Sequence, residues 1–160
     1  MEEFLLRFLS KELVVFIISM VPVVELRGAI PVGVALGLEW HTAYLLSVLG
    51  NIIPVPFIIL FFRPIIEYLE KTKLFGRIAE KIRKRTHRKA KDMKGLKLFA
   101  LYLFVAIPLP GTGAWTGAAI AALLKMRIKH SFVAITAGVV SAGVIMLVLS
   151  KIGEFLITTI

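Results

Sequence analysis

The chain has 160 residues, of which 58% are hydrophobic, and its formal net charge is +10. Its mean hydropathy of +0.88 is far above that of a soluble globular domain, so the composition predicts an integral membrane protein. The sequence contains no cysteine, which excludes disulfides, thiolate metal sites and cysteine nucleophiles.

The first apolar segment, at about residues 13–37, is interrupted by Pro22, Gly28 and Pro31. Prolines break a regular helix, and broken backbone at membrane depth is tolerated only where protein or a water-filled cavity satisfies its polar groups. We therefore expect a re-entrant hairpin, which enters the membrane, turns and returns to the same side.

A transmembrane helix is predicted next, over about residues 42–62, because this apolar stretch is long enough to cross the hydrocarbon layer. Asn51, followed by Pro54 and Pro56, predicts a kink in this helix that faces a cavity. The hairpin and the helix together form the first predicted repeat, residues 1–62.

Most of the positive charge lies in residues 63–97, which hold thirteen Lys or Arg against four acids. Apolar residues recur in this linker at mostly helical spacing, which predicts an amphipathic helix on the membrane surface; a solvated loop that sets the topology is the alternative. Nucleic-acid binding is disfavoured because the densest basic run, residues 81–89, has no Phe, Trp or Tyr interleaved with its charges. The residues expected to meet anionic headgroups are Arg83, Lys84, Arg85, Arg88 and Lys89.

Lys and Arg concentrate on the cytoplasmic side of membrane proteins, so we place this linker inside the cell, in the cytoplasmic membrane. A full crossing by the next apolar segment, about residues 98–124, would leave the cationic loop 125–130 outside. A second re-entrant hairpin removes that conflict. The prolines and glycines at residues 108–113 provide its turn, and a transmembrane helix over about residues 131–157 completes the second repeat, residues 98–160.

The two halves share one plan, because an offset of 86 residues places Pro22 over Pro108. With the linker inside, the first hairpin enters from outside and the second from inside. The predicted fold is therefore an all-α integral membrane protein with two inverted repeats. Such repeats with broken helices are typical of transporters, whose substrate site lies near the middle of the membrane.

Glu25 and Arg27 are the strongest site candidates, because a charge at the bilayer centre costs at least ~2.5 to 3.5 kcal/mol on insertion scales. We interpret Arg27 as the receptor of an anionic group and Glu25 as the acid that exchanges a coupling ion, a proton or sodium. The structural alternative is that the two charges pair across the hairpins or snorkel at a rim. The expected substrate-binding residues are Glu25, Arg27, Gly28, Pro31, Asn51, Pro108, Pro110, Gly111, Thr112, Gly113 and Trp115.

Two motifs, ELRGAIPVG at residues 25–33 and PLPGTGAWTG at residues 108–117, resemble those of the small multidrug export protein family. That family is related, at the level of re-entrant architecture, to the DedA-like membrane proteins, which are implicated in moving polyprenyl phosphate carriers. The resemblance implies a small transporter built from re-entrant hairpins.

Function is therefore predicted as a small secondary transporter that moves an anionic lipid or polyprenyl phosphate carrier. The alternatives are a proton-coupled exporter of small hydrophobic cations and a non-transporting membrane scaffold. An enzyme is disfavoured, because the intramembrane residues offer no Ser/His/Asp set, paired carboxylates or metal cluster. We expect no metal or other cofactor, membrane lipids as partners, and a homodimer, since 160 residues leave little protein to seal two hairpins from lipid.

Overall fold

The computed structural model describes residues 10–71, 76 and 94–159, and every regular element in these ranges is an α-helix. In chain order the helices are α2 (Lys11–Met20), α3 (Glu25–Ala35), α4 (Trp40–Ile52), α5 (Pro54–Glu70), α7 (Lys94–Ala106), α8 (Ala114–Leu123) and α9 (Ile128–Thr159). The five basic residues predicted to lie on the membrane surface, Arg83, Lys84, Arg85, Arg88 and Lys89, are outside the described residues.

Among the described residues, two stretches are long and apolar enough to cross a bilayer. Trp40–Tyr68 comprises α4 and most of α5, and Ile128–Leu156 lies within α9. The first stretch continues beyond residue 62, where the sequence had placed its end, so that Arg63 lies inside α5. Both stretches support the predicted class, a helical membrane protein.

The first long stretch is interrupted at Ile53, a single residue between α4 and α5. Pro54 lacks the backbone N–H that would bond to the carbonyl of Gly50 in a continuous helix, so the hydrogen-bond ladder is broken at this point. The structure therefore shows a break in the helix two residues after Asn51, although Ile53 itself keeps helical dihedral angles.

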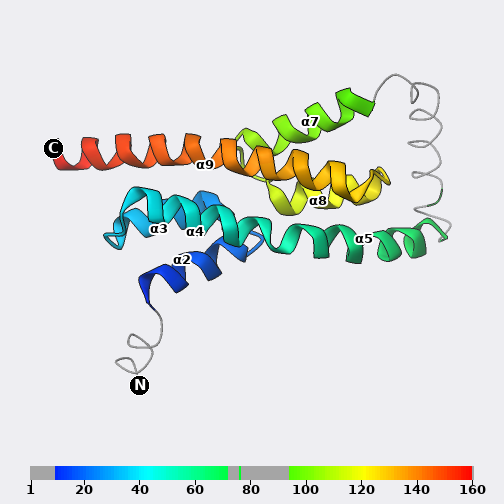
Figure 1. Cartoon of the computed structure of the whole chain (residues 1–160), viewed down its shortest axis with the longest axis horizontal. Helices are drawn as coiled ribbons and strands as arrows, with labels where there is room; N and C mark the ends of the chain where they lie inside the picture. Colours follow the sequence, from blue (N-terminus) through cyan, green and yellow to red (C-terminus); the bar gives the residue numbers. More distant parts are fainter. Residues whose placement is uncertain (1–9, 72–75, 77–93, 160) are drawn as a thin grey trace.

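The described part of each half contains two short helices joined by a turn. In the first unit, α2 and α3 are joined by residues 21–24, the first turn; in the second unit, α7 and α8 are joined by residues 107–113, the second turn. Figure 1 shows the two units opening toward opposite ends of the molecule, with both turns near its middle.

The long helices hold the two units together. Both α2 and α3 pack on α4, and α7 packs on α9; α3 also contacts α9, and α8 contacts both α9 and α5. The core lies where these helices meet, and its largest fully buried apolar side chains are Leu26, Ile30, Ile59, Ile135, Val15, Val55, Val105 and Val139.

Glycines permit the closest helix contacts in both halves. A Cβ atom on Gly50 of α4 would lie 2.0 Å from Ser19 Oγ and 2.5 Å from the carbonyl oxygen of Phe16, both in α2. A Cβ atom on Gly138 of α9 would lie 2.7 Å from Val105 Cβ and 2.9 Å from the carbonyl oxygen of Tyr102, both in α7. Each long helix therefore approaches the first helix of its own unit at a glycine.

Candidate functional site

Glu25 begins α3 in an uncommon backbone conformation. Its φ is 49°, in the left-handed region, although the residue is not glycine. Its side chain is buried, with 5% of the residue exposed. A left-handed backbone conformation at a non-glycine residue is strained and persists only where surrounding contacts hold it. Such strained residues cluster at functional sites.

The Glu25 carboxylate caps the start of α8 from the other half of the chain. Its Oε1 atom accepts a hydrogen bond from the backbone N–H of Trp115 at 3.1 Å. Gly113, the residue before α8, provides no side-chain cap, and a Cβ atom there would lie 2.1 Å from Glu25 Oε2. A carboxylate is stabilised at a helix N-terminus, where N–H groups are unpaired and the dipole is positive. Gly113 therefore makes room for the charge.

Arg27 binds the second turn, which directly follows α7. Its Nη1 atom donates to the carbonyl oxygen of Leu109 at 2.6 Å, and its Nη2 atom donates to Thr112 Oγ1 at 2.9 Å. A longer contact of 3.4 Å joins Nη2 to the carbonyl oxygen of Ile107. A guanidinium beside carbonyls just beyond a helix C-terminus is favourably placed, because those carbonyls lack helical partners.

The second turn also reaches back to the first unit. The indole Nε1–H of Trp115 donates to the carbonyl oxygen of Met20, the last residue of α2, at 3.2 Å. The two turns are thus joined by side chains from both units. We call the contacts of Glu25, Arg27 and Trp115 across the turns the interlock. These contacts match the structural alternative raised from the sequence, in which the charges find partners across the hairpins.

Asn51 and Ser47 add polar groups that lack partners. Both are fully buried in α4, and neither the Asn51 amide atoms nor Ser47 Oγ has a hydrogen-bond partner among the described residues. They lie four residues apart, so they share one face of α4. Asn51 lies close enough to Glu25 to interact with its carboxylate, although without the geometry of a regular hydrogen bond. Buried polar atoms without partners are rare in proteins and call for an explanation, such as a bound group.

The structure brings most of the predicted site residues together, but not all. Pro108, Pro110 and Gly111 belong to the second turn, where Gly111 has a φ of 81°. Gly28 packs against Val24 in the first unit. Pro31 lies farther along α3 and lines a separate groove between α3 and α9, so it does not contribute to the interlock.

Sequence reasoning missed Ser47 and the main-chain carbonyls of Met20, Ile107 and Leu109. Ser47 could have been identified from its spacing of four residues before Asn51 on a predicted helix. The carbonyl of Met20 could not, because every residue has one. Among the described residues, no three His, Asp or Glu side chains gather in a way that could hold a metal ion.

Comparison with known proteins identifies the family. Residues 25–145 match the family described as "putative small multi-drug export protein", a range that begins directly after the first turn and includes the second turn and just over half of α9. The chain belongs to this family. No curated protein and no solved structure matches it.

Proposed function

We propose that this member of the small multi-drug export family is a secondary transporter that exports small hydrophobic cations in exchange for protons, with Glu25 as the exchanging acid. The observation that carries the proposal is the buried Glu25 carboxylate, which is held by the Trp115 amide rather than by a cationic side chain. The family description supports it independently.

A buried carboxylate held by amides can accept either a proton or a cation. Both neutralise its charge in a medium of low dielectric constant, so the two compete for the same group. The ring of Trp115, at the start of α8, would favour an organic cation over a hydrated inorganic one. The unpartnered amide of Asn51 adds a polar group beside the carboxylate.

Binding at Glu25 would also release the interlock. The charged carboxylate accepts the N–H of Trp115 more strongly than a neutralised one would, and the strained backbone of Glu25 stores energy that release would recover. Proton or cation binding would thus weaken the contact between the two turns, which is the kind of change that alternating access requires.

Transport of an anionic lipid or polyprenyl phosphate, the function that the sequence favoured, would require a different use of Arg27. Its guanidinium already donates to Leu109 and Thr112, and an anionic headgroup would have to displace these partners. For this reason we rank cation export first. The relation to DedA-like proteins and the absence of enzymatic activity stay predictions.

For the arrangement in the membrane, we propose two re-entrant units that enter from opposite faces as inverted repeats. Their opposite open ends in Figure 1 support this proposal. So do the glycine contacts, because Phe16 and Ser19 of α2 correspond to Tyr102 and Val105 of α7 at the same offset of 86 residues.

The orientation follows from charge, since Lys and Arg gather on the cytoplasmic side. The end of the molecule that holds the C-terminus of α5 and the loop between α8 and α9 would be cytoplasmic. Among the residues whose side chains the structure describes, this end holds the basic residues Arg63, Lys71, Lys97, Lys125, Arg127 and Lys129 and the acid Glu67. We place the protein in the cytoplasmic membrane on this basis.

A homodimer is proposed because the turns are partly uncovered within one chain. Val23 of the first turn is 93% exposed, and Leu109 of the second turn is 55% exposed. Irregular backbone cannot face lipid in the middle of a membrane, so a second copy or a water-filled cavity has to cover these turns.

The proposed function is tested with purified protein in vesicles that carry a pH gradient. We expect the protein to move tetraphenylphosphonium, a lipophilic cation, against its concentration gradient when protons flow the other way. Glu25→Gln should abolish this transport because the amide cannot exchange a proton, whereas Glu39→Gln, an exposed acid in the loop before α4, should retain it. Equal transport by both variants would refute the role of Glu25.

A further inference from the structure

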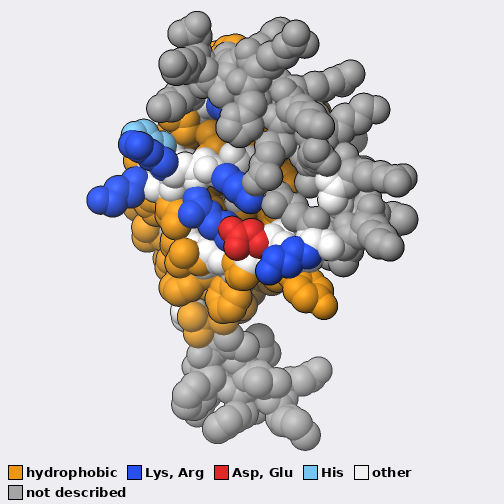
Figure 2. All heavy atoms as spheres, turned by 90° about the vertical axis from the view of Figure 1, so that its right-hand side faces the viewer, with side chains coloured by type: hydrophobic (Ala, Val, Ile, Leu, Met, Phe, Trp, Pro, Cys, Tyr) orange, Lys and Arg blue, Asp and Glu red, His pale blue; other side chains and the backbone are white. Residues whose placement is uncertain are grey.

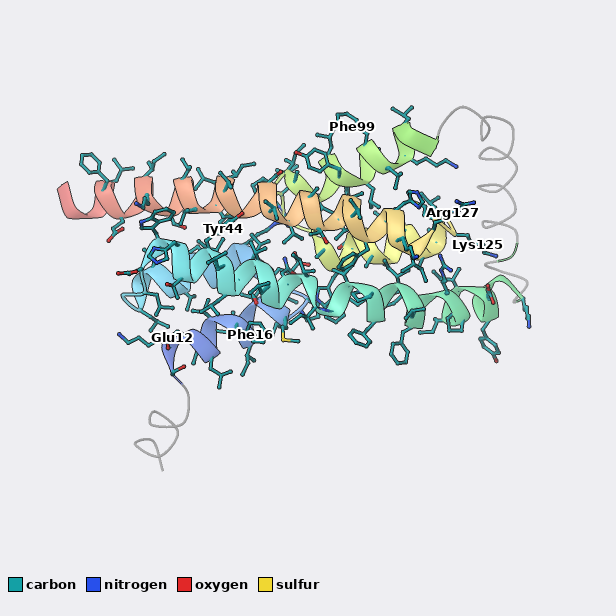
Figure 3. All side chains as sticks on the ribbon, viewed as in Figure 1. Glu12, Phe16, Tyr44, Phe99, Lys125 and Arg127 are labelled. Atoms are coloured by element: carbon teal, nitrogen blue, oxygen red, sulfur yellow. The ribbon has the colours of Figure 1, made fainter. Side chains whose placement is uncertain are left out.

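A second pocket lies away from the interlock, where the first part of α7 meets the loop between α8 and α9. Its volume is about 370 Å³. Four basic side chains line it, Lys97, Lys125, Arg127 and His130, and Leu98 and Met126 contribute apolar surface. Figure 3 shows Lys125 and Arg127 close together where the chain turns from α8 into α9.

The loop that forms this pocket has a defined shape. Arg63 of α5 donates a hydrogen bond to the carbonyl oxygen of Met126, which anchors the middle of the loop. Lys125 has a φ of 49°, and its N–H bonds to the carbonyl oxygen of Ala122 at 3.0 Å. Lys125 and Arg127 therefore project from a turn whose backbone is held by these hydrogen bonds.

Positive charge dominates this end of the molecule. Figure 2 shows Lys and Arg side chains spread over it around a single acidic patch. Among the residues that the structure describes, neither Lys97 nor Arg127 forms an ion pair with a carboxylate. Cations that surround one pocket repel one another, and a bound anion would relieve that repulsion.

We propose that this pocket binds the phosphate of an anionic phospholipid headgroup. The phosphate would lie among Lys97, Arg127 and His130, and the planar guanidinium can donate two parallel hydrogen bonds to it. Basic pockets between membrane helices on the cytoplasmic side are suited to such headgroups.

The neighbouring surface indicates a lipid rather than a free phosphate. Leu98, Leu124 and Met126 line the pocket itself, and Leu123, next to Leu124 at the end of α8, is 43% exposed. Acyl chains attached to a headgroup in the pocket could lie against these side chains. A soluble phosphate would gain nothing from them.

Native mass measurement of the full chain in mild detergent tests the proposal, with phosphatidylglycerol and the neutral lipid phosphatidylcholine titrated separately. We expect phosphatidylglycerol to bind more tightly. Lys97→Gln and Arg127→Gln should each weaken its binding by about fivefold. Lys129→Gln removes the same charge from an exposed position in the same region that does not line the pocket, so its effect should be less than about twofold.

Three results would overturn the proposal. The first is equal affinity of the unaltered protein for the two lipids, which does not depend on any variant folding. The second is an equal loss in Lys129→Gln and Arg127→Gln, which would indicate a general charge effect. The third is displacement of phosphatidylglycerol by an equal concentration of glycerol phosphate, which would identify a free phosphate as the ligand.

Discussion

Glu25 Oε1 accepts a hydrogen bond at 3.1 Å from the backbone N–H of Trp115, a residue 90 positions later in the chain. The carboxylate lies at the start of α8. Arg27, two residues after Glu25, donates to the carbonyl of Leu109, beyond the end of α7. The two opposite charges of one short motif therefore bind the two sides of one turn. This arrangement explains why the motif carries both charges: Glu25 meets unpaired N–H groups at the start of α8, and Arg27 meets carbonyl groups after the end of α7.

Gly113→Ala should displace the Glu25 carboxylate. The φ of 170° at Gly113 is extended and suits alanine, so the effect comes from space alone: the new Cβ atom would lie 2.1 Å from Glu25 Oε2. We expect loss of proton-driven cation transport with a stability change of about 1 kcal/mol, because the side chain can move aside. Gly153→Ala has open space around its Cβ atom and should leave transport unchanged. Transport and thermal unfolding in detergent measure both effects.

Thr112→Val should weaken the second turn. Thr112 Oγ1 contacts Arg27 Nη2 and the carbonyl oxygens of Ile107 and Leu109, and valine keeps the shape while removing these hydrogen bonds. The expected loss is about 1–3 kcal/mol, since Arg27 is left with one partner fewer. Thr116→Val is the control, because it makes the same change at an exposed threonine of α8. An equally large fall in the unfolding temperature of Thr116→Val would contradict the assigned role of Thr112.

Asn51→Leu should separate stability from transport. The Asn51 amide is fully buried without a hydrogen-bond partner, so a leucine of similar shape should leave the unfolding temperature unchanged or raise it. Transport of tetraphenylphosphonium should fall, because the site beside Glu25 loses its polar group. If Asn51 only fills space, transport will survive the substitution.

Sequence predicted the helices better than the contacts between them. The two breaks were predictable because Pro22, Pro108 and Pro110 remove backbone donors inside apolar segments. The interruption before Pro54 was predictable for the same reason.

The partner of each charge was not predictable. It depends on how two segments 80 or more residues apart approach each other, which periodicity does not encode. Arg27 was expected to bind a ligand, yet its partners in the structure are the Thr112 hydroxyl and two main-chain carbonyls, and carbonyls have no signature in a sequence. The same holds for Trp115, whose indole N–H meets the carbonyl of Met20.

Cysteine labelling should place the two short loops on opposite sides of the membrane. His41 and His130 are both exposed, and the natural chain contains no cysteine that could react with the label. In intact cells, a membrane-impermeant maleimide should label His41→Cys but not His130→Cys, and both should react after the membrane is opened. Labelling of both in intact cells would contradict the proposed inverted repeats.

The central claim is that Glu25 exchanges a proton for a cationic substrate, and proton release on substrate binding tests it most directly. Tetraphenylphosphonium is added to the purified protein in weakly buffered detergent solution containing a pH indicator. At a pH at which Glu25 carries its proton before the cation is added, the unaltered protein should release protons in proportion to the cation bound, and Glu25→Gln should release none. Binding of the cation without proton release, or equal release by Glu25→Gln, would contradict the account.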